Sequence, residues 1–304
     1  MVRGAGMVLT KFVIARILGF AIMVFVTLSV VFYVTHALPS DPTIVYISPR
    51  MSPEVKQDLI QRFALDKSLE TQYVYYLKNF FQGDLGDSFY YGVNVWTILK
   101  DRTTPTVLLL GIALLCAVLL DVISDRKYPQ KALINVGAYV LPFTFLGLLL
   151  LLIFSFVMDL FPIGGWMSQS IKSGPFTATV LDVLHHLVLP AGTLIIWLLF
   201  AYIPLVKTLS RGSIAEKKSL VPPGLTTVIA GSFLFYSLQI VMTVFSWPGY
   251  HVTMLEASLN YDYTLVFGAL LIGLIFCFAV TVCLEIFYGT LTFMSLQSST
   301  TSPS

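Results

Sequence analysis

The chain has 304 residues, of which 57% are hydrophobic and only 11% are charged. Soluble domains carry roughly 25% charged residues, so this composition excludes one or two ordinary soluble domains. The formal net charge of +2 is too small to indicate a nucleic-acid-binding protein. The composition predicts a multi-pass protein embedded in the lipid bilayer of a cell membrane.

Six apolar segments are long enough to cross a bilayer, whose core of about 30 Å requires about 20 helical residues. Backbone groups in hydrocarbon must be paired within their own segment, and these segments are continuously apolar, which predicts helices. We therefore expect an all-α membrane protein with six transmembrane helices. The predicted spans are residues 12–36, 104–124, 132–157, 187–206, 224–246 and 264–288.

These spans divide the chain into four parts. Residues 1–36 hold the N-terminal segment and the first span, and residues 37–103 form a cap between the first two spans. Residues 104–290 form a five-helix core, and residues 291–304 form a polar tail.

Lys and Arg residues predict the orientation, because short connections rich in these residues stay in the cytoplasm. The cap contains both signs of charge, and long segments cross largely regardless of charge. We expect both termini in the cytoplasm and the cap outside. The basic residues are Arg3, Lys11 and Arg16 before or early in the first span; Arg126, Lys127 and Lys131 after the second; Lys207, Arg211, Lys217 and Lys218 after the fourth; and only Lys172 after the third.

The predicted cap is rich in Tyr and Phe, which is typical of an ordered segment rather than a linker. Its most distinctive motif consists of Gly83, Asp84, Leu85, Gly86 and Ser88. Glycine accepts backbone conformations that tight turns require. We expect this motif to hold the shape of the cap, with contact to cargo as the alternative.

A second external segment has two interpretations of equal weight. Trp247, Pro248 and Gly249, together with Glu256, are candidates for an external gate that re-enters the membrane. Alternatively, the aromatic residues anchor the chain at the membrane surface.

Cofactors and enzymatic chemistry are not expected. Cys116, Cys277 and Cys283 lie in apolar runs without the CxxC spacing of a metal site. Four ionisable residues in or beside the spans, Arg16, Asp121, Lys207 and Glu285, lie near predicted inner ends, where snorkelling to the surface suffices. No carboxylate lies near a bilayer midplane, which argues against an ion-coupled secondary carrier or a channel.

Short motifs recur in order along the chain. Their order within a six-span frame, covering about residues 10–290, resembles the permease subunits of oligopeptide and dipeptide ABC importers. The motifs are LPSDP at 38–42, FALDK at 63–67, QY at 72–73, GDLGDSF at 83–89, TTPT at 103–106, LPF at 141–143, FPIGG at 161–165, HLVLPA at 186–191, VFSWPG at 244–249 and EA at 256–257.

The resemblance implies partners and cargo. Permeases of this kind pair with a second homologous permease chain to form the translocation pathway. Two cytoplasmic ATPase subunits and an extracytoplasmic solute-binding protein complete the importer. The cargo is mostly short peptides, with nickel or oligosaccharides in some branches.

The chain departs from the family between its fourth and fifth spans. The family has a long connection there with an Ala-Arg-Ala-Lys-Gly-Leu type core that docks on the ATPase, whereas residues 207–223 contain no such core. Pro222 and Pro223 prevent a helix from running through the connection. We expect a reduced ATPase-contact loop made of Ser213, Ile214, Glu216 and Leu220. The alternative is a permease-derived accessory or scaffold subunit that has lost ATPase coupling.

Overall fold

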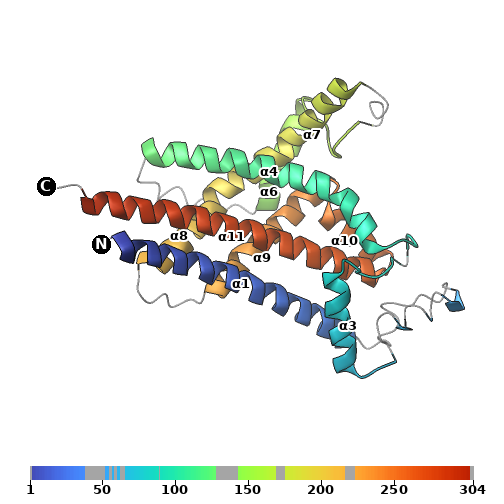
Figure 1. Cartoon of the computed structure of the whole chain (residues 1–304). Coiled ribbons are helices and arrows are strands. Elements are labelled where there is room, and N and C mark those ends of the chain that lie inside the picture. The colour runs from blue at the N-terminus through green and yellow to red at the C-terminus, as the bar shows by residue number, and fades with distance from the viewer. Residues whose placement is uncertain are drawn as a thin grey trace. The chain divides into compact units, whose positions relative to one another are not determined.

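The structure is a computed structural model, and it confirms the predicted all-α class (Figure 1). Across the described residues, the only β-type pairing is one isolated bridge between Asp87 and Asn94. The structure describes residues 2–37, 52–54, 57, 60–61, 66–88, 90–127, 143–168, 175–215 and 223–301.

Five described helices are long and apolar enough to cross a membrane, and a sixth, shorter apolar helix covers Thr144–Val157. They fall on the six predicted spans, although the third is matched only in part because residues 128–142 lie outside the described part. The helices are α1 (Val2–Ala37), α3 (Leu69–Phe81), α4 (Val95–Lys127), α6 (Phe143–Leu151), the π-helical η2 (Leu152–Val157), α7 (Phe176–Trp197), the π-helical η4 (Leu198–Tyr202), α8 (Ile203–Ala215), α9 (Pro223–Val244), α10 (Tyr250–Leu259) and α11 (Tyr263–Thr301).

Several of these helices extend beyond the predicted spans, because hydropathy marks only the apolar part of a helix; α1, for example, begins at Val2 rather than at residue 12. Helix α4 begins at Val95 rather than at residue 104. At this start, the backbone N–H of Trp96 donates to the Asn94 side-chain oxygen at 3.0 Å. Helix α7 begins at Phe176, eleven residues before the predicted 187. Helix α11 continues through the predicted polar tail as far as Thr301.

The chain divides into two compact units, and α1, α4 and α11 contribute residues to both. Unit 1 consists of Met1–Met23, Val107–Trp247 and Leu274–Ser304. Unit 2 consists of Val24–Thr106 and Pro248–Gly273, and therefore contains the whole range of the predicted cap together with α10.

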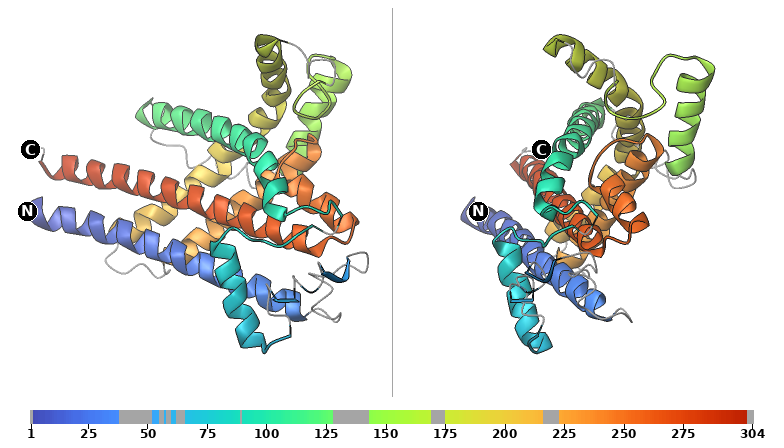
Figure 2. Two further views of the ribbon diagram at one scale, coloured as in Figure 1. Left: turned by 45° about the vertical axis from the view of Figure 1, so that its right-hand side comes forward. Right: turned by 90° about the vertical axis from the view of Figure 1, so that its right-hand side faces the viewer.

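Unit 2 has its own apolar core, built from the start of α4, α10 and the start of α11. Its buried residues include Val95, Leu99, Tyr250 and Leu265. A Cβ atom at Gly268 would lie 2.6 Å from the Val95 side chain, so the helices approach closely there. Helix α3 lies across the end of α1 (Figure 2), where Tyr73 contacts the rings of Phe25, Phe32 and Tyr33 and bonds Ser29 at 2.6 Å.

Unit 1 contains the bundle of α7, α8 and α9 with the second half of α11. Tyr202 in η4 is buried, stacks on Trp197 and bonds Thr281 of α11 at 2.7 Å. Gly231 of α9 lies against the Phe278 ring of α11, with no room for a side chain. The first residues of α1 and the last turns of α11 lie at the same end of this unit (Figure 1).

Candidate functional site

The glycine motif of the predicted cap forms the tight turn that the sequence indicated. Gly83 and Gly86 have φ angles of 79° and 86°, in the region that favours glycine. The Asp84 side chain accepts hydrogen bonds from the backbone of Gly86 at 3.0 Å and from Asn94 at 3.3 Å. Leu85 packs against the apolar core of unit 2. The motif therefore stands as a turn that connects α3 to α4.

Ser88 ends this turn and bonds a residue that the sequence analysis missed. The Ser88 hydroxyl donates to the buried carboxylate of Asp262, which also accepts from the Tyr90 backbone at 3.2 Å. The other oxygen of Asp262 accepts from the Leu265 backbone at 3.1 Å, as a helix N-cap does. Asp262 thus joins the motif to the start of α11. An acidic residue before an apolar run was the available sequence signal.

The candidate gate residues are divided between the two units. Trp247 belongs to unit 1 and is fully buried, and its backbone N–H bonds the Met242 carbonyl at 2.8 Å. Pro248, Gly249 and Glu256 belong to unit 2, where Gly249 precedes α10. Glu256 is 44% exposed and lies 3.9 Å from Arg102. The buried Trp247 side chain is in a different environment from an aromatic side chain that anchors a chain at the membrane surface.

Tyr250 fixes the first turn of α10 to α4 within unit 2. Its hydroxyl and that of Thr103 are 2.7 Å apart. Burial raises the pKa of the Tyr250 phenol, and the bond to Thr103 opposes this shift in part. The phenol is therefore neutral at physiological pH and serves as a hydrogen-bonding group.

The reduced ATPase-contact loop is only partly described. Ser213 and Ile214 lie in the last turn of α8, which ends at Ala215. Glu216 and Leu220 lie outside the described residues. Helix α9 begins at Pro223, a favoured position for proline at a helix start.

The expectation that the ionisable residues snorkel is wrong for Arg16 and Glu285. Both side chains are fully buried, with 3.4 Å between Arg16 Nη1 and Glu285 Oε2. Arg16 of α1 also bonds Thr226, and Thr227 donates to Glu285 Oε2 at 2.9 Å. Pairing replaces solvation here, because isolated charges are costly to bury.

A second ion pair joins α4, α8 and α11. Lys207 Nζ lies 2.7 Å from one carboxylate oxygen of Asp121 and 2.9 Å from the other. The Tyr288 hydroxyl donates to the same carboxylate at 2.9 Å, and the Lys207 ammonium lies 5.1 Å from the Tyr288 ring centre. Sequence spacing gives no sign of these pairs, since the partners lie far apart along the chain.

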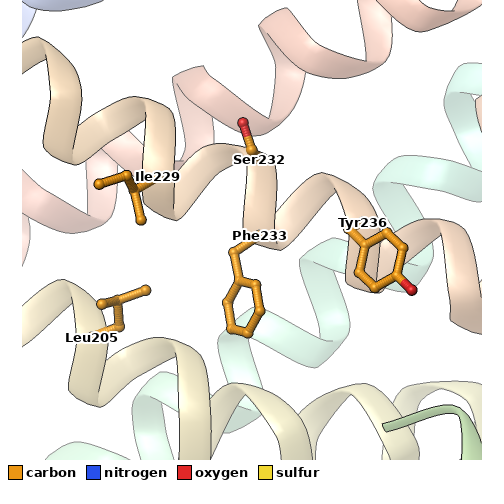
Figure 3. Close-up of a pocket in the computed structure, with 5 residues that line it drawn as sticks. All are labelled: Leu205, Ile229, Ser232, Phe233 and Tyr236. Atoms are coloured by element: carbon orange, nitrogen blue, oxygen red, sulfur yellow. The ribbon is translucent and has the colours of Figure 1, made fainter. Parts of the chain in front are cut away.

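An open pocket of 390 Å³ lies between α8 and α9 of unit 1. Figure 3 shows Ile229 and Phe233 of α9 directed toward Leu205 of α8, with Tyr236 one turn further along. The lining is largely apolar, and the Ser232 hydroxyl points away from Leu205 and Phe233. Such a surface can contact an uncharged solute weakly.

Comparison with known proteins gives a consistent result. Residues 9–110 match the family of the N-terminal part of membrane components of binding-protein-dependent transport systems. The dipeptide transport system permease protein of Escherichia coli K12 is 25% identical, over 91% of this chain and 96% of the relative. The di/tripeptide permease protein of Pseudomonas aeruginosa UCBPP-PA14 is 26% identical over the same shares.

A more distant relative agrees with these two. The oligopeptide transport system permease protein of Bacillus subtilis 168 is 22% identical, over 85% of this chain and 90% of the relative. Family match, ordered motifs and apolar helices coincide, and the predicted resemblance is confirmed. Along most of its length the chain is similar to membrane-spanning permease subunits of ABC importers named for dipeptides, di/tripeptides and oligopeptides.

Proposed function

We propose that this chain forms half of the translocation pathway of an ATP-driven importer for short peptides. The observation that carries the proposal is the similarity over nine tenths of the chain to permeases named for dipeptides and di/tripeptides. A second, homologous permease chain supplies the other half. ATP hydrolysis belongs to separate chains, so this subunit itself has no catalytic residues.

The surface between α8 and α9 suits a role in the pathway. Its pocket offers apolar contacts from Leu205, Ile229 and Phe233, and Tyr236 lies one turn further along α9. A peptide needs weak, sequence-tolerant contacts to pass, because tight binding would slow its release. A largely apolar surface meets this requirement for side chains of many kinds.

The remaining partners follow from the proposed orientation. Two ATPase subunits act at the cytoplasmic side, where α8 ends at Ala215 and Ser213, Ile214, Glu216 and Leu220 form the contact segment. An extracytoplasmic binding protein delivers the peptide on the side of residues 37–103 and of the gate candidates Trp247, Pro248, Gly249 and Glu256.

Affinity purification combined with uptake tests this function. The tagged chain, isolated in mild detergent from its native host, is expected to bring with it a second permease and an ATPase. Deletion of its gene should abolish uptake of a labelled dipeptide, and the wild-type gene should restore it. Normal dipeptide uptake in the deletion strain, with no ATPase in the purified complex, would contradict the proposal.

Cysteine labelling tests the orientation. In a background with Cys116, Cys277 and Cys283 replaced by alanine, Leu259→Cys should react with an impermeant thiol reagent in intact cells, since Leu259 is 73% exposed. Ser219→Cys should react only after permeabilisation, because residues 207–223 are predicted to be cytoplasmic. Labelling of Ser219→Cys in intact cells would reverse the orientation.

A further inference from the structure

Two ion pairs in unit 1 have no part in the function proposed above. Arg16 of α1 pairs with Glu285 of α11, and Asp121 of α4 pairs with Lys207 of α8. Neither pair borders the pocket between α8 and α9. Charged residues within membrane-spanning segments are rare and usually functional, so these pairs call for an explanation.

Helix α11 connects the two pairs. Glu285 and Tyr288 are three residues apart on α11, a spacing that places them on neighbouring turns of one face. Glu285 meets Arg16 of α1 and Thr227 of α9, while Tyr288 donates to Asp121 of α4. The backbone oxygen of Glu285 also accepts from Ser210 of α8 at 3.3 Å. One short stretch of α11 thus binds four other helices.

The two ion pairs and their hydrogen-bond partners include residues of both helices that flank the predicted ATPase-contact segment. Lys207 and Ser210 lie on α8 before this segment, and Thr226 and Thr227 lie on α9 after it. A force applied to the segment therefore reaches these residues through both helices, within a few helical turns.

Because these charges are largely buried, an arrangement with the ion pairs partly separated is unfavourable, so the pairs are either formed or broken. Separating Arg16 from Glu285 would leave an uncompensated charge in an apolar bundle, which is strongly unfavourable. Hydrogen bonds to charged groups are also directional, so they fix the register of the helices more strictly than apolar contacts do. Coupling between distant sites requires an element of this kind, with discrete arrangements that both sites bias.

We propose that Arg16, Asp121, Lys207 and Glu285 form a coupling layer that links movement of α8 and α9 to α1, α4 and α11, and thereby links ATP hydrolysis to peptide transport. The four are positioning residues, because their charges meet one another rather than the peptide. The inference rests on the proposed function, in which an ATPase acts on the segment between α8 and α9.

The decisive variant replaces the buried pair with apolar side chains, Arg16→Met together with Glu285→Leu. A buried pair replaced by well-packed apolar residues of similar volume often leaves stability unchanged or improved. Thr227 can then bond a carbonyl of its own helix. If the pair were merely structural, this variant would behave as wild type. As a coupling element, its loss should reduce the stimulation of ATP hydrolysis by peptide-loaded binding protein about fivefold or more.

The measurement uses the complete complex in proteoliposomes. Basal ATP hydrolysis, stimulated hydrolysis and labelled dipeptide uptake are recorded together with the thermal midpoint of the complex. We expect an unchanged midpoint and basal rate, with loss of stimulation and of uptake per ATP. Wild-type stimulation and uptake per ATP in the double variant would overturn the coupling layer.

The Asp121–Lys207 pair provides a second test that does not depend on the buried pair. Lys207 is partly exposed, so Lys207→Met should assemble and lose stimulation, whereas Lys207→Arg should retain most of it. Ser237→Ala is the matched control: its buried hydroxyl bonds the Phe233 carbonyl of its own helix at 2.7 Å, and stimulation should be normal. Equal stimulation in Lys207→Met and wild type would also contradict the coupling layer. A wild-type complex without any peptide-stimulated hydrolysis would instead contradict the proposed function.

Discussion

The predicted cap in unit 2 and the helix ends of unit 1 each bury a carboxylate completely, and they surround it with different partners. Asp262 accepts from two backbone N–H groups and a serine hydroxyl, without a cationic partner among these contacts. Glu285 pairs with Arg16 and accepts from Thr227. The first arrangement fixes a loop on a helix start, and the second fixes whole helices against one another. Asp262 therefore maintains a local shape, whereas Glu285 links helices that are far apart in the sequence.

The largest effect is expected from breaking the Arg16–Glu285 pair on one side only. Glu285→Gln leaves the Arg16 guanidinium buried without a counter-charge, which typically costs about 3–5 kcal/mol. The thermal midpoint of the purified chain should fall sharply, and the yield should fall with it. The double apolar variant is the control and should recover the midpoint. A single variant as stable as wild type would show that the pair does not hold these helices.

The next largest effect is expected at Asp262. Asp262→Ala removes the N-cap of α11, worth about 1 kcal/mol, and leaves the buried Ser88 hydroxyl without its acceptor, at a further cost of roughly 1–3 kcal/mol. Limited proteolysis should cut residues 83–94 faster, while the transmembrane helices stay protected. Glu256→Ala is a suitable control, since that carboxylate is 44% exposed. Equal cleavage rates in Asp262→Ala and wild type would contradict the role of Asp262.

A smaller and strictly local effect is expected at Gly86. Its φ of 86° is unfavourable for a branched side chain, so Gly86→Val should cost about 1–3 kcal/mol in the turn without leaving a buried polar group unpaired. Hydrogen exchange of the backbone between α3 and α4 should accelerate, with membrane insertion unchanged. Val93→Ala, at a 45% exposed position of the same region, should exchange as wild type does. Unchanged exchange in Gly86→Val would show that the turn has no requirement for glycine.

The smallest effect, measured as retention of the ATPase in the purified complex, is expected in the ATPase-contact segment. Ile214→Asp with Leu220→Asp removes the two apolar side chains predicted to contact the ATPase in residues 207–223. Because this segment is short, we expect the ATPase to dock mainly on the partner permease and to remain bound after purification. The ratio of ATPase to permease measures this directly. Complete loss of the ATPase would show that this chain is a principal docking site.

The sequence and the structure agree where local signals decide the outcome. Apolar length predicted the spans, and the glycines at 83 and 86 predicted a turn. Asn94 and Asp262 also carried a local signal, a polar residue before a helical run, and with it the early start of α4 and the cap of α11 were within reach. The pairs Arg16–Glu285 and Asp121–Lys207 carried none, because their partners meet only through tertiary packing. Residues that look suited to snorkelling therefore gave a wrong expectation.

The functional predictions show the same difference between features that are visible in the sequence and features that depend on the three-dimensional arrangement. Ordered motifs sufficed to predict the permease family, since they occur along the whole chain. The gate candidates Trp247, Pro248, Gly249 and Glu256 remain predictions, because a gate is defined by movement between two states.

ATP-driven transport of short peptides by this chain can be measured in the complex reconstituted in proteoliposomes, with a labelled dipeptide and the binding protein on one side and ATP on the other. We expect the dipeptide to accumulate against its gradient when ATP is present, and not to accumulate when this chain is omitted or ATP is replaced by a non-hydrolysable analogue. Equal accumulation without ATP would show that this chain is not part of an ATP-driven importer.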